Sequence, residues 1–594
     1  MPLSRVHSIV GSPARRCGVR GPGPAGLAAA IAIIWRGASG GPSAAILAQG
    51  HHMKILSGNA GHDGHIAYID DGRLLFSIEA EKDSGARHSF LCPDVLFRAL
   101  GRIDDFPDVV AVSGWWHSDA PRKPKVAGGY LGPGCDTIID KSYRLLGRDI
   151  RYFSSSHERS HILCSYGLSP FEQGQRCYAL VWEGGLGAFY HVDSQVRVRK
   201  LGSVIDYPGK RYGFLYALAD DSFPAHQSWP RAEDAGKLMA LAAFGRPGAC
   251  GPQQKALIKL ILDSPPEQML YPKAEFSRSI LFNMGVQSQD FKDLAYEFSK
   301  QLIDRFMRFA ELNLKDKLPL LISGGCGLNC DWNSVWKTCG LFEDVFVPPC
   351  TNDSGSSVGT AVDAMHHYTG RAKLSWDVYA GEEFIMDDAD LSAITFHMLD
   401  LREVARFLRD GNVIAWVQGR YEIGPRALGN RSLLATPFTT EMHQRLNRIK
   451  QRESFRPIAP VCLEEELDRL FEHSGPSPHM LYFQRVKTHS LPAVTHVDGS
   501  ARVQSVNAVQ NARLYRLLVE FKAQTGYGVL CNTSLNFKGA GFINRLSDLV
   551  DYVYQQGIDG LVVGDQFGIV DRAISNKTRS ACPAQTVDGG MWPG

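Results

Sequence analysis

Two histidines in the stretch SSSHERSHILCSYGL are spaced to share one face of a helix. His157 and His161 are four residues apart, and residues at that spacing lie one above the other on a helix. Two imidazoles placed in this way can bind one metal ion, and Ser155 or Ser156 can cap the helix start. Because the same spacing is common on helix faces that bind nothing, the pair needs a third ligand to predict a metal site.

Asp353 is the candidate for that third ligand. It lies in the loop PPCTNDSGSSVG, after an apolar strand predicted at VFV and before a predicted helix, and loops in such positions hold ligands in α/β proteins. A mixed set of imidazole and carboxylate ligands with open positions suits Fe(II), Mn or Zn. Sequence spacing alone does not show whether His157, His161 and Asp353 meet in space.

Another histidine, His62, precedes Asp63 in the glycine-rich turn GHDGH between two predicted strands. A histidine on such a turn can act as a general base toward an alcohol. Asp63 can equally stabilise the turn through an Asx hydrogen bond. Both interpretations stay open from sequence alone.

Basic residues are concentrated in GPRALGNRS and IKQRESFRPIAP, where proline and glycine turns flank them. Arg426, Lys450, Arg452 and Arg456 fall within these stretches. Guanidinium groups fixed by such turns bind phosphate or carboxylate through paired hydrogen bonds. The stretches therefore predict a phosphate or nucleotide site, and the alternative is a surface covered by salt bridges.

Length and composition restrict the class of protein. A chain of 594 residues exceeds what one hydrophobic core organises, so we expect at least two domains. The formal charge of +2 argues against a globally basic nucleic-acid binder. Thirteen cysteines without a C-x-x-C pair are typical of reduced thiols in a cytoplasmic enzyme.

Residues 1–52 differ from the rest because they contain no Asp, Glu or Lys. The run GLAAAIAIIW behind several arginines resembles a secretory signal and is too short for a membrane span. A disordered extension and a start codon assigned too early are the other interpretations. We favour the early start, since a clear strand-turn-strand pattern begins directly at Met53. No other segment predicts contact with a membrane, so we expect a soluble protein.

The strand pattern from Met53 recurs later in the chain. MKILSG, HIAYID and RLLFSIEAE read as strands joined by glycine-containing turns, and CYALVWEGGLGAFYHVDSQVRVRKLGSV repeats the pattern. Two related halves are expected for residues 53–375. A second α/β domain is expected for residues 376–575, in which AVTHVDGSARVQSV alternates like a strand pair. Residues 576–594 read as a tail.

Several motifs together resemble those of the O-carbamoyltransferase family of antibiotic and nodulation-factor biosynthesis. They are QGRYEIGPRALGNRSLLATP, ESFRPIAP, THVDGSARVQSV, GVLCNTSLN, GKLMALAAFG and SGGCGLNC. The resemblance covers Met53 to about Asp571. It implies an N-terminal domain of the actin and sugar-kinase type (a duplicated RNase H-like fold), followed by a YrdC-like α/β domain.

The resemblance also implies a reaction. Members make a carbamoyladenylate from carbamoyl phosphate and ATP with Mg²⁺, and then transfer the carbamoyl group to a hydroxyl of a small-molecule acceptor. It implies that His157, His161 and Asp353 hold Fe(2+) or a similar divalent metal. It implies that His62 is the base that deprotonates the acceptor.

In the second domain the resemblance assigns six residues to carbamoyl phosphate and the nucleotide: Arg426, Lys450, Arg456, Arg502, Asn536 and Lys538. Three positions depart from the family pattern. Ser156 replaces the first histidine of a usual His-His-x-x-x-His pattern and leaves the two expected ligands intact. Lys538 stands where an arginine is expected, which keeps the charge and loses the bidentate fork. Glu183 stands where an aspartate is usual, which adds a methylene to a phosphate or metal-water contact.

Other functions remain as alternatives. These are carbamoylation of a protein thiol, a sugar-kinase-like phosphotransferase, and a non-catalytic nucleotide-binding regulator. The acceptor is not readable from the sequence. Trp115, Trp116 and Tyr130 can line a pocket for a bulky acceptor or belong to the core.

Overall fold

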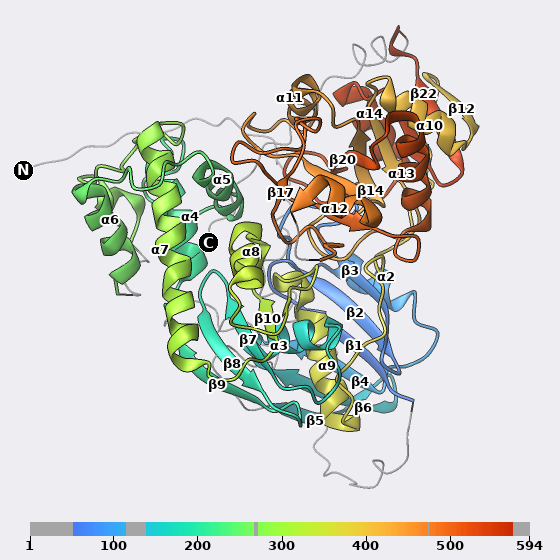
Figure 1. Cartoon of the computed structure of the whole chain (residues 1–594). Coiled ribbons are helices and arrows are strands. Elements are labelled where there is room, and N and C mark those ends of the chain that lie inside the picture. Colours follow the sequence, from blue (N-terminus) through green and yellow to red (C-terminus); the bar gives the residue numbers. More distant parts are fainter. Residues whose placement is uncertain (1–51, 115–137, 266–270, 473–474, 574–594) are drawn as a thin grey trace, which may run out of the picture.

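The computed structural model describes residues 52–114, 138–265, 271–472 and 475–573 (Figure 1). The expected tail, nearly all of the N-terminal extension, and Trp115, Trp116 and Tyr130 lie outside these ranges. None of the helices within the described ranges has the length and apolar composition needed to cross a membrane.

The first described sheet has the strand order β3-β2-β1-β4-β6-β5. Its strands are β1 (Lys54–Asn59), β2 (His65–Asp70), β3 (Arg73–Glu79), β4 (Val109–Ser113), β5 (Ile139–Leu145) and β6 (Arg148–Ser155). β1, β2 and β3 are antiparallel neighbours, whereas β4 is parallel to both β1 and β6. The predicted hairpin turn between β2 and β3 forms at Asp71 and Gly72, both with positive φ, as a type I′ turn requires.

A second sheet repeats this order as β9-β8-β7-β10-β11. Its strands are β7 (Cys177–Trp182), β8 (Gly187–Val192), β9 (Val198–Ser203), β10 (Leu320–Ser323) and β11 (Val345–Phe346). The strand directions also match those of β3-β2-β1-β4-β6, because β7 is antiparallel to β8 and parallel to β10. This duplication confirms the predicted α/β domain of the actin and sugar-kinase type.

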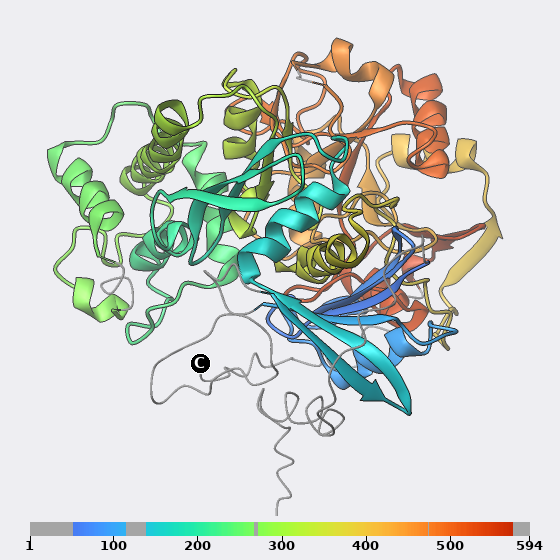
Figure 2. The same cartoon turned by 90° about the horizontal axis from the view of Figure 1, so that it is seen from below.

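Two helices cross between the halves. α3 (His157–Leu168) follows β6 of the first half and packs against β7 and β10, while α9 (Ser356–Thr369) follows β11 and packs against β1 and β4. The helices also contact each other, as Figures 1 and 2 show. A Cβ at Gly359 would lie 1.7 Å from the carbonyl oxygen of Ser160, so only glycine permits this close crossing.

The remaining helices of the first domain cover its sheets. α2 (Pro93–Leu100) contacts β2 and β3. The others lie on the side of the second sheet: α4 (Pro208–Ala219), α5 (Ala232–Ala242), α6 (Pro252–Asp263), α7 (Gln289–Asn313) and α8 (Cys330–Thr338). They enclose an apolar core around Trp182, Trp332 and Trp336, all nearly inaccessible to solvent.

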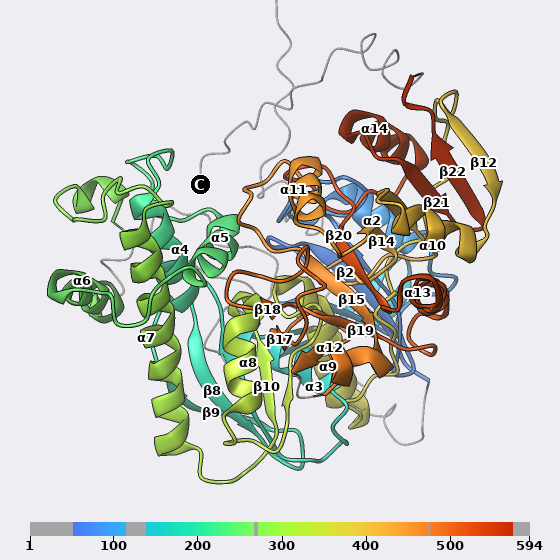
Figure 3. The ribbon, with the colours of Figure 1, turned by 45° about the horizontal axis from the view of Figure 1, so that its top comes forward.

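The second domain contains a mixed sheet in the order β12-β22-β21-β13-β14-β20-β15-β19 (Figure 3). Its strands are β12 (Ile394–Met398), β13 (Ile414–Val417), β14 (Arg431–Ala435), β15 (Ala459–Leu463), β19 (Gln504–Val506), β20 (Val529–Ser534), β21 (Gly560–Val563) and β22 (Gln566–Val570). This α/β arrangement agrees with the expected class, and its YrdC-like character stays a prediction.

Helices cover both faces of this sheet. One face packs against α10 (Leu401–Arg409) and α13 (Ala512–Thr525), and the other against α11 (Thr440–Ile449) and α14 (Leu546–Gln556). α12 (Leu467–Leu470) is a single short turn. The predicted boundary between residues 375 and 376 falls in the segment between α9 and β12, and it stays a prediction.

The strand pair expected in AVTHVDGSARVQSV is wrong. β18 (Ser500–Ala501) pairs with β17 (Gln484–Val486), which in turn pairs with β16 (Phe471–Glu472), whereas β19 pairs with β15 in the large sheet. The alternation is real, but the two short strands find their partners in distant segments that a local pattern does not reveal.

Candidate active site

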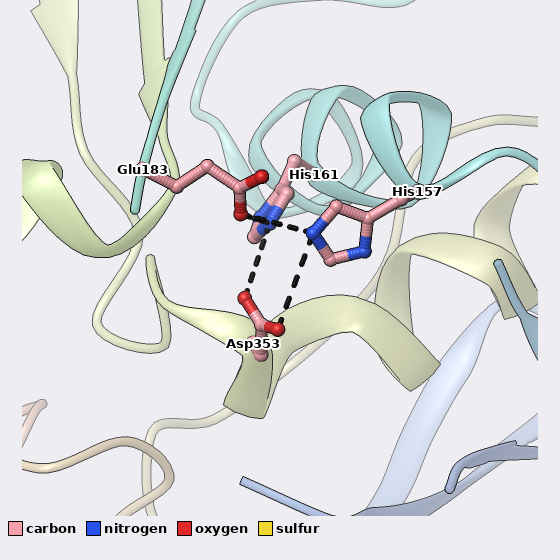
Figure 4. Close-up of side chains that lie close together, drawn as sticks. All are labelled: His157, His161, Glu183 and Asp353. Carbon is pink, nitrogen blue, oxygen red and sulfur yellow. Dashed lines mark hydrogen bonds and ion pairs between the residues drawn. The ribbon is translucent and has the colours of Figure 1, made fainter. Parts of the chain in front are cut away.

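Four side chains converge where the two halves of the first domain meet: His157, His161, Glu183 and Asp353 (Figure 4). All four are buried, and one ligand atom of each lies within 4.8 Å of the others. Nε2 of His157 lies 2.9 Å from Oε2 of Glu183. Nε2 of His161 lies 3.3 Å from Oδ1 of Asp353.

Local structure fixes the start of α3 and orients the imidazole of His157. Ser156 caps α3 by accepting a hydrogen bond from the Arg159 N–H at 3.4 Å, as predicted. Nδ1 of His157 lies 3.2 Å from the carbonyl oxygen of Gly114, to which only an N–H can donate. This bond directs Nε2 to the centre of the cluster, and such outer hydrogen bonds fix the tautomer of metal-binding histidines.

The two carboxylates dominate the charge of this cluster. Burial lowers the pKa of His161, but Asp353 and Glu183 outweigh it and raise the pKa to about 10. Burial raises the pKa of Glu183, but His157 and His161 hold it well below its usual value. Within the described residues, the second oxygen of Glu183 is buried without a hydrogen-bond partner. Two imidazole nitrogens and two buried carboxylates fit a divalent transition metal.

Equivalent segments of the duplication supply these residues. The turn between β1 and β2 carries His62, and the corresponding turn between β7 and β8 carries Glu183. The segment after β6 carries His157 and His161, and the corresponding segment after β11 carries Asp353. The fold therefore brings four segments to one place, because the same chain path occurs twice.

His62 lies next to this cluster and is held by an acid. Its Nδ1 lies 3.0 Å from Oδ2 of Asp63, and its Nε2 lies 3.8 Å from Oδ2 of Asp353. Nδ1 of His88 lies 2.8 Å from the other oxygen of Asp63. Burial raises the pKa of Asp63, but hydrogen bonds from His62 and His88 hold it well below its usual value. An ionised Asp63 fixes the His62 ring as the acid of a catalytic triad fixes its histidine.

The cluster also affects the protonation of His62. Burial lowers its pKa, but Asp353 and Asp63 outweigh the burial and raise it to about 9. A cation bound by Asp353 would oppose the contribution of Asp353, since the charge of a bound ion reverses the local effect of its ligand.

Basic side chains of the second domain gather against the first domain. Nη2 of Arg426 donates to the carbonyl oxygen of Leu328 at 3.0 Å. The Cβ position of Gly236 on α5 lies 3.7 Å from Nη2 of Arg456. Burial, with the charges of Arg502 and Arg456, holds the pKa of Arg426 below its usual value. Among the described residues, Nε of Arg426 and Nε of Arg502 are buried without hydrogen-bond partners, so these guanidinium groups retain donors for an anion.

The side chains of Lys450 and Asn536 form hydrogen bonds with other groups of the protein. The Lys450 ammonium donates to the carbonyl oxygen of Ser534 at 2.7 Å, and to the Asn536 carbonyl oxygen at 3.0 Å and Oδ1 at 2.6 Å. Nδ2 of Asn536 donates to the Ala540 carbonyl oxygen at 2.9 Å. Together they shape the loop 534–540, on which Lys538 is exposed. Contact of these three residues with a ligand stays a prediction.

Comparison with known proteins identifies the family. Residues 143–362 match the model of the carbamoyltransferase N-terminus, and residues 405–569 match that of the carbamoyltransferase C-terminus. A 3'-hydroxymethylcephem-O-carbamoyltransferase from Amycolatopsis lactamdurans is 48% identical over 517 residues, which cover 86% of this chain and 98% of that protein. The chain belongs to the carbamoyltransferase family.

Further relatives agree with this family. The protein of the same name from Streptomyces clavuligerus is 47% identical and covers 86% of this chain and 98% of its own length. Nodulation protein U from Bradyrhizobium diazoefficiens is 32% identical, with 82% of this chain and 93% of that protein covered. A ROK family glucokinase from Streptomyces griseus, solved with glucose and AMPPNP, covers 52% of this chain and 98% of its own at 11% identity. Its TM-score of 0.26 is too low to carry an argument.

The candidate site contains one residue that sequence reasoning did not assign as a ligand. Glu183 was expected at a phosphate or metal-water contact, and it lies directly in the buried cluster. The signal was available, because the turn VWEGGLG occupies the place in the second half that GHDGH occupies in the first. Arg452, near Arg456, belongs to the basic cluster as well.

Proposed function

We propose that this carbamoyltransferase activates carbamoyl phosphate with ATP at the basic cluster and transfers the carbamoyl group to an alcohol at His62. The acceptor we propose is the primary alcohol of a 3'-hydroxymethylcephem. One observation carries the proposal: an ionised Asp63 holds His62 beside a buried set of two imidazoles and two carboxylates. A positioned general base can deprotonate an alcohol, and an adjacent metal ion can polarise oxygen atoms of the reacting groups.

The first half-reaction takes place at the basic cluster. Water breaks the bond between carbamoyl and phosphate, releasing phosphate and carbamate. An oxygen of carbamate then attacks the α-phosphorus of ATP, and pyrophosphate leaves to give carbamoyladenylate. Each step places negative charge on leaving phosphates, and Arg426, Arg456 and Arg502 supply fixed positive charge that stabilises it. Mg²⁺ accompanies ATP in this step.

The second half-reaction takes place in the first domain. The acceptor oxygen attacks the carbamoyl carbon, and the bond from that carbon to AMP breaks. His62 takes the proton of the alcohol, and Asp63 stabilises the imidazolium that forms. Products are the carbamate ester and AMP. Water must be kept from the adenylate between the halves, and enclosure between two domains serves this purpose.

His157, His161, Glu183 and Asp353 would hold the divalent metal, which we propose to be Fe(2+). When bound it supplies Lewis-acid polarisation of oxygen atoms in the reacting groups. The donor set alone also suits Mn and Zn.

The acceptor assignment rests on relatives. Two 3'-hydroxymethylcephem-O-carbamoyltransferases match this chain at 48% and 47% identity over 98% of their lengths. Nodulation protein U is 32% identical, which favours the cephem class over other hydroxylated acceptors.

The test separates the two half-reactions. The purified chain is incubated with ATP, Mg²⁺, Fe(2+) and carbamoyl phosphate, first without an acceptor, and pyrophosphate and carbamoyladenylate are measured by enzyme coupling and mass spectrometry. We expect both products from the wild type and neither from Arg426→Ala. Arg409→Ala serves as the matched control, because Arg409 lies exposed on α10 and pairs with Asp410.

A 3'-hydroxymethylcephem is then added. We expect AMP release and a product heavier by one carbamoyl group. Folded, metal-loaded protein that forms neither pyrophosphate nor product, with or without the acceptor, would contradict the proposal. Pyrophosphate without carbamoylated cephem would reject only the acceptor.

A further inference from the structure

The turn between β1 and β2, residues 59–65 and here called the base turn, carries His62 and Asp63. The residues at its two ends, Asn59 and His65, are partners in the antiparallel pairing of β1 with β2. Both are buried, with 1% and 0% of their surface exposed. A buried polar side chain is stable only with hydrogen-bond partners, and the partners of these two side chains indicate their role.

The imidazole of His65 joins the base turn to helix α9. Its Nε2 accepts a hydrogen bond from the Ser357 N–H at 3.0 Å, and its Nδ1 lies 3.0 Å from the carbonyl oxygen of Asp63. Because a backbone N–H can only donate, Nε2 carries no proton and Nδ1 is the donor to Asp63. Burial lowers the pKa of His65 to about 4, which agrees with this neutral tautomer.

The contact with Ser357 connects His65 to the segment that carries Asp353. The turn Asp353–Gly355 leads directly into α9, where Ser357 is the second residue. The first N–H groups of a helix have no partner inside it, and His65 satisfies one of them. Oγ of Ser357 also donates to the carbonyl oxygen of His65 at 2.9 Å. Side chain and backbone of His65 are therefore both bonded to the start of α9.

Asn59 makes the matching connection on the other side of the base turn. Its Nδ2 lies 3.2 Å from the carbonyl oxygen of His62 and 3.5 Å from that of Asp353, and donates to both. Its Oδ1 accepts a hydrogen bond from the Gly61 N–H at 3.3 Å. The base turn is thus attached at both ends to the segment that carries Asp353.

The bond from His65 supports a backbone conformation that is unfavourable by itself. Asp63 has a φ of 52°, in the left-handed region that few residues other than glycine adopt. Such conformations persist where the surrounding structure holds them. The bond to the Asp63 carbonyl oxygen fixes the peptide group that follows Asp63. It thereby fixes the carboxylate that lies 3.0 Å from Nδ1 of His62.

We propose that His65 is a positioning residue for the transfer step. It holds the peptide group of Asp63, and through Asp63 the ring of His62, at a fixed place relative to Asp353 in the buried cluster. The inference rests on the proposed function, because His62 is assigned there as the base. His65 acts through Asp63 and needs no contact of its own with the acceptor.

Two amide substitutions separate the two bonds of His65. An asparagine amide reaches about as far as Nδ1 and a glutamine amide about as far as Nε2, and each amide carries a donor and an acceptor. His65→Asn therefore keeps the bond to Asp63, whereas His65→Gln keeps only the bond to Ser357. We expect His65→Gln to lower kcat of carbamoyl transfer roughly 100-fold, the effect of misplacing a reacting group by about 1 Å. His65→Asn should stay within about tenfold of the wild type, since it loses one neutral hydrogen bond.

The other kinetic parameters show whether the effect is confined to transfer. KM for the acceptor and pyrophosphate release without an acceptor should match the wild type in both variants, because neither depends on the base. His191→Gln is the matched control, since His191 lies on β8 and packs against Tyr178. Thermal unfolding establishes that each variant is folded. Unchanged kcat in His65→Gln overturns the inference, as does an equal loss in His65→Asn and His65→Gln.

A double-mutant cycle with His62→Ala distinguishes positioning from a general structural role. If His65 acts through His62, His65→Gln lowers transfer in the wild type and causes no further loss in the His62→Ala background. Residual transfer is followed by mass spectrometry over long incubations. A further loss of similar size in that background overturns the inference.

Hydrogen exchange, read by mass spectrometry, tests the placement without any reaction. We expect peptides that cover residues 59–65 to take up deuterium faster in His65→Gln than in the wild type and in His65→Asn, with no change in the second domain. Wild-type protein that forms no carbamoylated product would reject the proposed function, and deuterium uptake would then decide the role of His65. Equal protection of the base turn in His65→Gln and the wild type overturns the inference.

Discussion

Nδ1 of His62 lies 3.0 Å from Oδ2 of Asp63, its neighbour in the chain. Asp63 has a positive φ of 52°, so its carboxylate is presented by a backbone conformation that few residues adopt. This fixes which ring nitrogen of His62 is anchored and leaves Nε2 on the side of Asp353. A base whose ring is fixed before the acceptor arrives loses no orientation entropy during proton transfer.

We predict that His62→Ala and Asp63→Asn lower carbamoyl transfer by about 10²–10⁴-fold, the usual contribution of general base catalysis. Asparagine tolerates positive φ, so Asp63→Asn changes the hydrogen bonding of His62 and keeps the turn. Acceptor-independent pyrophosphate release should stay at the wild-type rate in both variants. Both reactions are followed with and without the cephem acceptor, and His397→Ala on the exposed edge strand β12 is the control. Loss of pyrophosphate release together with transfer would contradict a role of His62 confined to the transfer step.

Glu183 gives a second prediction. Glu183→Gln keeps the shape of the side chain and removes its negative charge. If Glu183 is a ligand, we expect metal affinity to fall by at least about tenfold, because loss of outer-shell partners already lowers it by that factor. Glu183→Asp should retain more metal because it keeps the charge. Metal content after purification and competition with a chelator measure the effect. Normal metal content in Glu183→Gln, beside loss in Asp353→Asn, would mean that Glu183 lies outside the coordination sphere.

The features of this site that depend on neighbouring residues in the chain were predicted correctly from the sequence. The spacing of His157 and His161 and the cap at Ser156 are properties of one helix, and α3 begins where they predict. The duplicated strand-turn-strand pattern predicted the two halves, because alternation and glycine turns depend on neighbouring residues.

The sequence did not show which of the candidate ligands lie close together in space. Asp353 meets His161 because α3 and α9 cross between the halves, and this crossing depends on contacts between residues far apart in the chain. Glu183 was missed as a ligand for the same reason. The environment of Lys450 was also not predictable from sequence. The residue type suggested a cation for a phosphate or nucleotide, and only the structure shows the three oxygen atoms that accept hydrogen bonds from its ammonium.

Gly359 provides a prediction that links packing to the metal site. In Gly359→Ala the new methyl group would lie 1.7 Å from the carbonyl oxygen of Ser160, so α3 and α9 must separate. We expect destabilisation of about 1–3 kcal/mol or more, as overpacking of a core gives, together with lower metal affinity because His161 and Asp353 move apart. Thermal unfolding and metal content are measured on the same samples. Gly101→Ala is the control, since its Cβ would meet its nearest atom at 3.4 Å with an ordinary φ. A destabilised variant with unchanged metal affinity would contradict the link.

The buried ion pair at the domain contact gives the last prediction. Lys82 is fully buried, lies 3.2 Å from Oε2 of Glu79, and donates to the carbonyl oxygen of Gly424 at 2.7 Å. Glu79 in turn accepts a hydrogen bond from the Gly424 N–H at 2.7 Å. Removing one partner of such a pair leaves an uncompensated charge, so we expect Lys82→Met to destabilise the protein by about 3–5 kcal/mol.

The cost should depend on pH in a defined direction. Burial raises the pKa of Glu79 to about 7, although Lys82 lowers it, so without Lys82 the folded-state pKa is higher still. A carboxyl whose pKa is raised in the folded state contributes stability below its unfolded pKa and loses it as pH rises through the folded value. The melting temperature of Lys82→Met should therefore fall further below the wild type at pH 8 than at pH 5. The control Lys141→Met, at an exposed position of β5, should show no such difference. An equal deficit at both pH values would mean that Glu79 does not carry the buried charge.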